Sequence, residues 1–213
     1  MEAACGIQSP VMSGNDQLRP ITLASQSPRR AMILRDAGID FQVIVPQFEE
    51  PDHAEWRFGP EEFAESASYY KARAVAEERP YDVILAADTV VAVDGELFGK
   101  PRDEADARRI LSRLAGSTHQ VITGVTLFEP TASRRLICHD VTQVRMRRLS
   151  DDELSAYLAT RQWEGKAGAY GIQDEHDPFV EAIEGSFTNV VGLPIELVRD
   201  MLTTFGILTP AAA

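Results

Sequence analysis

The chain has 213 residues, of which 44% are hydrophobic and 25% are charged, a composition typical of a globular protein with a sizeable core. The formal net charge of -12 argues against non-specific binding of nucleic acid, which usually needs a basic face. No run in the sequence approaches the roughly 20 apolar residues of a membrane helix, so we expect neither a membrane nor a nucleic-acid partner.

The chain shows no clear domain boundary. Residues 1–19 lack a basic start and a continuous apolar run, so we expect a flexible leader rather than a secretory signal, in a cytoplasmic protein. We expect residues 20–207 to form a single domain and residues 208–213 to form a tail. The two cysteines, Cys5 and Cys138, and the four scattered histidines lack the spacing of a metal site, although the cysteines leave a disulfide open.

Short strands and helices alternate in the first half of the domain. A strand over 21–24 leads into Ser27 and Pro28, a favourable N-cap and first residue of a helix, and Gly38 is the natural end of that helix. Further along, the pattern predicts a strand over 41–45, a helix from about 60, a buried strand over 82–87, a hairpin turn at 94–95 and a helix from about 103 to 115.

Hairpins and helices also make up the second half. Residues 121–128 and 136–146 are typical of an antiparallel pair of strands, and Ser150 with Glu153 forms a capping box that opens another helix. The last predicted elements are short strands over 170–173 and 179–183 and a helix over about 194–204. The mixture predicts an α/β (α+β-like) fold with a mixed, twisted sheet.

The start of the first helix is a candidate anion site. Free backbone N–H groups and a partial positive charge occur at a helix N-terminus, and Ser25, Ser27, Arg29 and Arg30 surround this one. Arginine suits phosphate because its planar fork donates hydrogen bonds in pairs. The alternative is an ordinary N-cap followed by two solvated arginines.

Three acidic residues are candidate metal ligands. Asp88 follows the apolar run over 82–87, so we expect it to end a buried strand with its side chain in a cleft, where it suits a metal ligand or a general base. Glu49 and Glu50 follow the strand over 41–45 and are the candidates for a further carboxylate ligand. The alternative for Asp88 is an acid in a surface turn.

Two lysines are further candidates for the binding of phosphate. Lys71 lies one step from the face formed by Phe63, Ala67, Tyr70 and Ala74 at helical spacing, and alone it is typical of a solvated helix lysine. The other is Lys100, which lies between Gly99 and Pro101, where glycine allows close approach and proline stiffens the loop.

Gln173 is a candidate for reading the base. Its amide both donates and accepts, as the edge of uracil or thymine does, and the alternative is a surface glutamine. Motifs of other classes are absent: the sequence has no P-loop, no GxGxxG after a strand and no GxSxG.

Taken in order, these segments resemble the Maf family of nucleotide pyrophosphatases over residues 20–204. The matching segments are LASQSPRR (23–30), KA (71–72), ADTVV (87–91), GKP (99–101), LAG (114–116), HQV (119–121), TGV (123–125), KAGAYGIQ (166–173) and NVVGLP (189–194). Each is short, but the ordered set is specific. The resemblance implies an elongated mixed twisted sheet flanked by helices, with two lobes around a cleft, similar to the inosine triphosphate pyrophosphatases.

The resemblance also implies an activity, the metal-dependent hydrolysis of dTTP or UTP to the monophosphate and pyrophosphate. The catalytic aspartate of the family matches Asp88, and the positions linked to specificity match Arg29, Thr89 and Gln173. We expect Mg²⁺ or Mn²⁺ to be held by Asp88 with Glu49 or Glu50.

The Tyr-Gly-Ile-Gln form of the last motif resembles the branch that acts on dTTP and UTP rather than the branch that acts on 7-methyl-GTP. The family often has glycine after this motif, whereas this chain has Asp174, which bears on base preference more than on the reaction.

Two other classes of function are alternatives to a pyrophosphatase. A nucleotide-binding regulator of cell division with little turnover would keep the anion site and Gln173 but would not need Asp88. A nucleic-acid-binding protein is opposed by the net charge of -12. We expect the protein to bind a nucleoside triphosphate and to form a homodimer.

Overall fold

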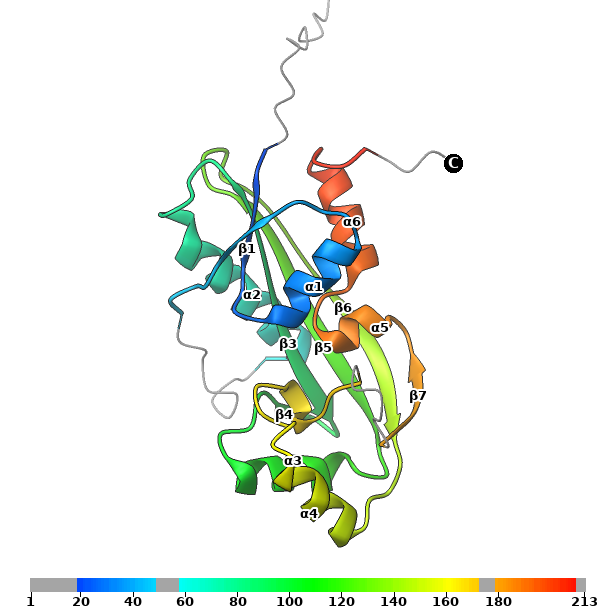
Figure 1. Cartoon of the computed structure of the whole chain (residues 1–213). Coiled ribbons are helices and arrows are strands. Elements are labelled where there is room, and N and C mark those ends of the chain that lie inside the picture. The colour runs from blue at the N-terminus through cyan, green and yellow to red at the C-terminus, as the bar shows by residue number, and fades with distance from the viewer. Residues whose placement is uncertain (1–18, 49–57, 173–178, 210–213) are drawn as a thin grey trace, which may run out of the picture.

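The computed structural model describes residues 19–48, 58–172 and 179–209, and its strands form one seven-stranded sheet. The strands are β1 (Ile21–Ala24), β2 (Gln42–Ile44), β3 (Val83–Val93), β4 (Glu96–Phe98), β5 (Thr118–Glu129), β6 (Arg134–Met146) and β7 (Val180–Glu184). Their order in the sheet is β2-β1-β3-β5-β6-β7, with β4 paired to β3. Figure 1 shows that the long strands β3, β5 and β6 run the length of an elongated, twisted sheet.

The sheet is mixed, as predicted. β1 pairs in parallel with β2 and with β3, whereas β3 pairs with β4 and β5, β5 with β6, and β6 with β7 in antiparallel fashion. The predicted hairpin at 94–95 joins β3 to β4, with Asp94 and Gly95 both at positive φ.

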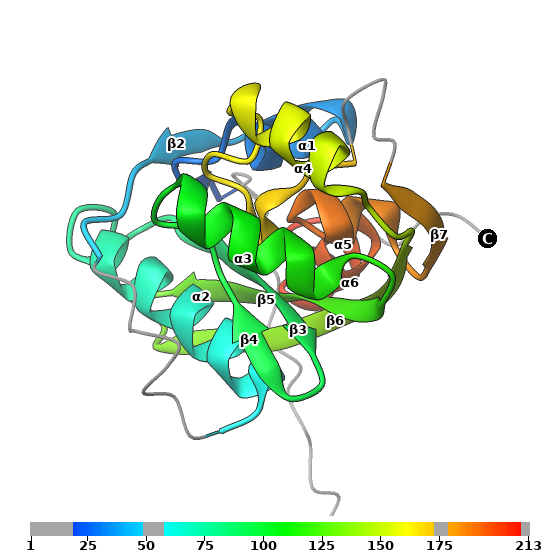
Figure 2. The same ribbon diagram turned by 90° about the horizontal axis from the view of Figure 1, so that it is seen from below.

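Helices cover both faces of this sheet. They are α1 (Pro28–Asp36), α2 (Pro60–Ala76), α3 (Glu104–Leu114), α4 (Asp151–Ala159), α5 (Phe187–Val191) and α6 (Ile195–Thr204), with a short 3₁₀ helix, η2 (Ala167–Ala169). In the views of Figures 1 and 2, α3 and α4 lie side by side at the end of the molecule opposite to β1 and α6. The capping box predicted for Ser150 and Glu153 is present at the start of α4.

The central strand β3 is buried on both faces, and its side chains alternate between two cores. Val83, Leu85 and Ala87 belong to the core that α1 and α6 cover. Ile84 and Ala86 belong to a separate core with residues of α2. By the same alternation, the next even-numbered side chain, Asp88, is directed to the side of α2.

One edge of β3 is open near its middle. β1 pairs with β3 as far as Ala86, and β4 pairs with it from Val91 onward, so neither strand pairs with residues 87–90. The opposite edge of the same residues is paired with β5. The chain leaves β1 at Ser25 and leaves β4 at Gly99, so two polar loops border this gap.

The prediction that Asp88 ends a strand is wrong, because β3 continues through it to Val93. The polar pair at 88–89 interrupts the apolar run but not the backbone pairing, since Asp88 pairs with Gly124 and Thr89 pairs with Thr123 on β5. The carboxylate therefore stands in the middle of a strand that β5 holds along one edge, both before and after Asp88.

The predicted face of α2 is also wrong in part. Tyr70 and Ala74 are exposed, whereas Lys71 is buried together with Phe63 and Ala67. The helix packs against β3 and β5 through pairs of adjacent buried residues that repeat every four positions. Lys71 can occupy this buried face because its ammonium pairs there with the Asp88 carboxylate.

The strand predicted over 170–173 is not formed by residues 170–172, and Gln173 lies outside the described residues. Immediately before it, Gly168 and Ala169 have φ of 72° and 64°. Left-handed backbone at two successive residues makes a tight turn. Tyr170 after this turn is extended, with φ of -136° and ψ of 169°, but it belongs to no strand.

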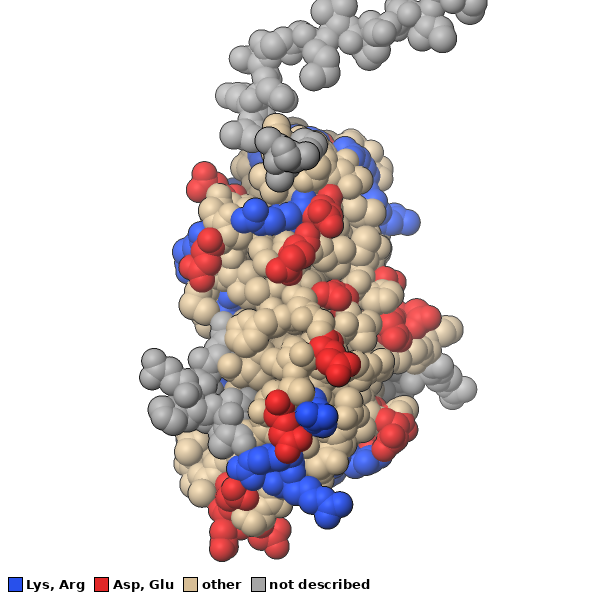
Figure 3. Space-filling view, turned by 90° about the vertical axis from the view of Figure 1, so that its right-hand side faces the viewer, with Lys and Arg blue, Asp and Glu red and all other residues tan. Residues whose placement is uncertain are grey.

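Charges of both signs alternate over the face that carries β7, α5 and α6. In Figure 3, Lys and Arg side chains on this face are interspersed with Asp and Glu, and no continuous basic surface forms there. Among the described helices, none combines the length and the apolar character needed to cross a bilayer.

The close packing of α2 on β5 depends on Gly124. A Cβ atom at this position would lie 2.3 Å from the carbonyl carbon and oxygen of Ala64 in α2. We therefore expect Gly124→Ala to lower the free energy of unfolding by about 1–3 kcal/mol, because backbone atoms of the helix must move. Chemical denaturation measures this. Thr118→Ala, at an exposed position of the same strand, should change stability by less than about 0.5 kcal/mol, and equal effects of the two changes would contradict the packing argument.

Candidate active site

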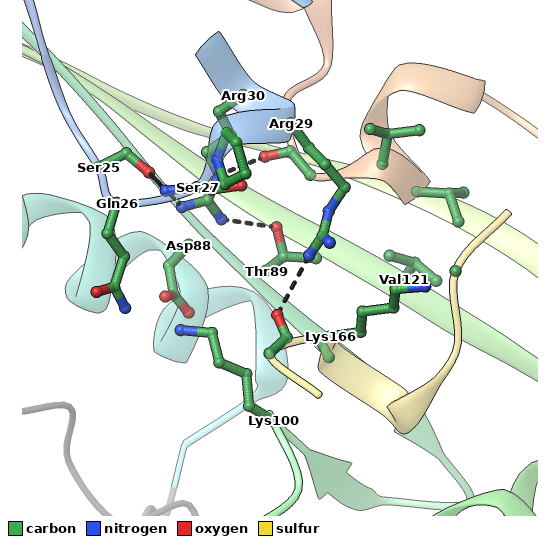
Figure 4. A pocket seen from close by; sticks show the side chains of 18 of the residues that line it. Ser25, Gln26, Ser27, Arg29, Arg30, Asp88, Thr89, Lys100, Val121 and Lys166 are labelled. Atoms are coloured by element: carbon green, nitrogen blue, oxygen red, sulfur yellow. Dashed lines mark hydrogen bonds between the residues drawn. The ribbon is translucent and has the colours of Figure 1, made fainter. Parts of the chain in front are cut away.

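A pocket of about 640 Å³ opens at the gap in the edge of β3. Figure 4 shows its polar side chains converging from three parts of the chain. Much of its lining comes from the β1–α1 segment, the middle of β3 and two loops of the other half: Ser25–Arg30, Asp88, Thr89, Gly99, Lys100 and residues 164–167 and 170–172. Val45, Pro46 and Phe48, which follow β2, also line it. The predicted residues Ser25, Ser27, Arg29, Arg30, Lys71, Asp88, Thr89 and Lys100 all line it.

Asp88 and Lys71 form a buried ion pair at one end of the pocket. The Lys71 ammonium donates to Oδ1 of Asp88, and the side chains are 9% and 8% exposed. Lys100 points toward the same carboxylate from the β4–α3 loop (Figure 4). Among the described residues, Lys71, Lys100 and the Asp88 carboxylate thus meet where β3 has its open edge.

Ser25 and Ser27 shape the turn into α1. The backbone N–H of Ser27 donates to Oγ of Ser25 at 3.1 Å. Ser27 occupies the N-cap position, as predicted, but its side chain makes no capping hydrogen bond. The first turn of α1, which carries no acidic residue, faces the pocket through Ser27, Pro28 and Arg29, so this end favours an anion.

Arg30 ties the pocket wall together. Its guanidinium donates to Oγ of Ser25 (3.3 Å), to Oγ1 of Thr89 (3.0 Å) and to the carbonyl oxygen of Gly192 (2.8 Å). At the predicted anion site, the Arg30 guanidinium is therefore hydrogen-bonded to groups of the protein itself. These bonds join β1, β3 and the end of α5 around the pocket.

Arg29 bridges the pocket. Its Nη2 donates to the carbonyl oxygen of Gly165 at 3.2 Å, across 136 positions of sequence. Figure 4 shows its side chain crossing from α1 to the segment that carries Lys166. The contact joins the half of the molecule around α1 to the half around α4.

The end of the pocket remote from Asp88 is less polar. Val121 and Lys166 lie there in Figure 4, and Tyr170, Ile172 and Val190 also line the pocket. In Figure 4 the Lys166 side chain extends toward Val121 and away from Asp88. The pocket therefore has an end rich in cations beside the Asp88 carboxylate and a largely apolar end about Val121.

A buried histidine supports this apolar end. Nε2 of His119 lies 2.7 Å from the Tyr170 hydroxyl, and the two rings are in edge-to-face contact at 5.4 Å between centroids. His119 is 1% exposed, and this burial lowers its pKa to about 4. A neutral imidazole therefore holds the tyrosine of the pocket wall.

A second buried polar group supports the floor. The Asn189 amide donates to the Val121 carbonyl oxygen at 3.0 Å and to Oγ1 of Thr142 at 2.9 Å. The backbone carbonyl oxygen of Asn189 accepts from the Thr123 hydroxyl, which is also 3.0 Å from that of Thr89. The network fixes α5 against β5 and holds Thr89 in place.

Three predicted residues cannot be located in this geometry, because Glu49, Glu50 and Gln173 lie outside the described residues. Within the ranges that the structure describes, no group of three or more His, Cys, Asp or Glu side chains could hold a metal ion. Asp88 is therefore the single described residue of the predicted metal set.

Comparison with known proteins extends over nearly the whole domain. The family model for Maf-like proteins matches residues 20–205. The chain belongs to the Maf family.

Similar Maf proteins carry names that state an activity. The chain is 44% identical to the dTTP/UTP pyrophosphatase of Symbiobacterium thermophilum, with 89% of this chain and 95% of the relative covered. It is also 44% identical to the dTTP/UTP pyrophosphatase of Dictyoglomus turgidum (88% and 97% covered) and 43% identical to that of Nitratidesulfovibrio vulgaris (88% and 88%).

Several segments of the chain that resemble the Maf family contain residues for which the sequence alone predicts no role. His119, Lys166 and Asn189 belong to such segments, and the structure places them against or beneath the pocket. No pattern in the sequence relates His119 to Tyr170, which are 51 positions apart. The one feature of the sequence that could have indicated a role for His119, Lys166 and Asn189 is that they lie within segments that resemble the Maf family.

The Lys71–Asp88 pair leads to a stability prediction. Lys71→Met removes one partner of a buried pair and should lower the free energy of unfolding by about 3–5 kcal/mol. Asp88→Leu should also destabilise, and the double variant should lose much less than the sum of the two single changes, because no buried charge is left alone. Chemical denaturation at pH 7 of all four proteins measures the coupling, and strictly additive effects would show that the two groups do not stabilise each other.

His119 leads to a prediction of pH dependence. Its folded-state pKa of about 4 lies below the ordinary value of 6.5, so the unfolded chain binds the proton first as the pH falls. The contribution of neutral His119 to the free energy of unfolding is complete above pH 6.5. It is lost progressively as the pH falls to 4, by about 3 kcal/mol in total.

Denaturation curves of the wild type and of His119→Phe between pH 7 and pH 4 isolate this effect. We expect the difference in unfolding free energy between the two proteins to shift in favour of the variant as the pH falls. A difference that stays constant over this range would contradict the assignment.

Proposed function

We propose that this protein is a pyrophosphatase that hydrolyses nucleoside triphosphates, dTTP and UTP in particular, to the monophosphate and pyrophosphate. The observation that carries the proposal is the buried Lys71–Asp88 pair at the cationic end of a pocket of nucleotide size. The names of Maf relatives that are 44% identical over most of both chains support the same substrates.

The shape of the pocket supports a particular orientation of the substrate. Lys100 and the start of α1 would bind the phosphates, because both favour anions. The largely apolar end at Val121 and Tyr170 would receive the nucleoside. The α-phosphorus would then lie near Asp88, between the two.

The chemical step follows from this placement. Asp88, which accepts a hydrogen bond from Lys71, takes a proton from a water molecule and aims that water at the α-phosphorus. The water oxygen forms a new bond to phosphorus, the bond from this phosphorus to the bridging oxygen breaks, and pyrophosphate leaves with the electron pair of that bond. Positioning and charge compensation are the main demands of such a reaction.

A divalent cation, Mg²⁺ or Mn²⁺, is part of the proposal. Such cations bind one or two carboxylates besides phosphate oxygens and water, and the Asp88 carboxylate is a suitable hard ligand at the cationic end. Glu49 or Glu50 would be the other carboxylate, as expected from the sequence. When bound, the ion would neutralise charge on the phosphate oxygens. A homodimer and a cytoplasmic location stay predictions.

Asp88→Asn tests the reaction most simply. Asparagine keeps the size of the side chain but cannot accept the proton, so kcat for pyrophosphate release from UTP with Mg²⁺ should fall on the order of 10²-fold or more. Asp94→Asn is the matched control, because Asp94 is an exposed residue of the β3–β4 turn. The control should retain the wild-type rate.

The results separate the proposal from its rival. Release of pyrophosphate and UMP by the wild type, lost in EDTA and in Asp88→Asn, supports the pyrophosphatase. A wild type that binds UTP for hours and leaves it intact would instead favour a nucleotide-binding regulator. A folded Asp88→Asn protein with unchanged kcat would remove Asp88 from the reaction.

A further inference from the structure

Lys166 lies at the end of the pocket remote from Asp88. It is half-buried and lines the pocket, and its side chain extends away from the Asp88 carboxylate toward Val121 (Figure 4). Its ammonium lies against Gly171: a Cβ atom at position 171 would be 2.8 Å from Nζ and 3.0 Å from Cδ and Cε. The absence of a side chain at Gly171 therefore gives the ammonium its place beside the pocket.

The backbone around Lys166 is held firmly. Its N–H donates to the Trp163 carbonyl oxygen at 3.3 Å, and its own carbonyl oxygen accepts from Ala169 at 3.1 Å. The N–H of Gly168 donates to the carbonyl oxygen of Gly99 at 3.1 Å, which joins this turn to the loop that carries Lys100. A backbone hydrogen bond thus joins the two segments that carry Lys100 and Lys166, whose side chains are directed to opposite ends of the pocket.

We propose that Lys166 determines base specificity, with its ammonium donating a hydrogen bond to the 4-carbonyl oxygen of the uracil or thymine ring. This inference rests on the proposed function, because it requires the nucleoside at the end of the pocket near Val121. A lysine ammonium has three donors and no acceptor. It therefore pairs with a carbonyl oxygen and is opposed by an amino group at the same ring position.

The chemistry of the pyrimidines gives this contact its selectivity. Uracil and thymine carry an oxygen at C4, whereas cytosine carries an amino group there, so the ammonium would face a donor instead of an acceptor. Sites that hydrogen-bond a substrate group discriminate strongly against an analogue that cannot make the bond. The apolar neighbours Val121, Ile172 and Val190 accept either ring and cannot supply this difference.

Lys166→Met tests the proposal, with UTP and CTP as substrates because they share the sugar and the triphosphate. Methionine keeps most of the length of the side chain without the charge. We expect kcat/KM for UTP to fall roughly 10- to 100-fold, the usual worth of a hydrogen bond to a charged group, while kcat/KM for CTP falls little or rises. The preference for UTP over CTP should therefore shrink by at least about tenfold.

A second variant moves the ammonium without removing it. Gly171 does not have a positive φ, and the atoms that an added Cβ would meet belong to the flexible end of Lys166, so Gly171→Ala should fold normally. It should displace the ammonium and reduce the UTP preference in the same direction. Lys100→Met is the matched comparison at the phosphate end and should lower kcat/KM for UTP and CTP by the same factor.

The outcomes separate the inference from the proposed function. Suppose that the wild type releases pyrophosphate from UTP and that Lys166→Met lowers kcat/KM for UTP and for CTP by the same factor. Lys166 is then a phosphate ligand or a structural residue, and the inference is overturned while the proposed pyrophosphatase activity stands. Equal use of UTP and CTP by the wild type also overturns it. If the wild type hydrolyses no nucleotide, the proposed function fails, and the inference falls with it.

Discussion

The ion pair between Lys71 and Asp88 constrains the rest of the structure. Two buried charges are stable only when they face each other closely, so α2 must lie against β3 at the level of Asp88. Gly124 on β5 allows that approach, because any side chain there would overlap the backbone at Ala64. The position of the carboxylate is therefore set by the packing of a helix on a sheet rather than by a loop.

The sheet provides the opening into which this carboxylate faces. β1 leaves β3 after Ala86 and β4 joins it only at Val91, so residues 87–90 have no strand paired to one edge while β5 holds the other. The loops that follow β1 and β4 bring anion-binding groups to the same gap. A rigid strand with one open edge thus explains how a central carboxylate of the sheet can also face a substrate.

Much of the fold could be predicted from the sequence, because hydrophobic periodicity and capping residues act locally. The capping box at Ser150 and the hairpin at 94–95 are where the pattern predicted them. The five-residue helix α5 is too short to show a period, and the burial of Lys71 depends on a partner 17 positions away. The Ser-Pro-Arg-Arg segment indicated an anion site but could not reveal that Arg30 is bonded to Gly192, 162 positions away.

If Asp88 directs water to the α-phosphorus, the oxygen of that water ends in the monophosphate, and hydrolysis of UTP in water enriched in the heavy oxygen isotope shows whether it does. Mass spectrometry of the products locates the oxygen that came from water. Attack of water at the α-phosphorus places one labelled oxygen in UMP and none in pyrophosphate. Label in pyrophosphate, or in orthophosphate released together with UDP, would show attack at another phosphorus and would contradict the placement of the substrate in this pocket.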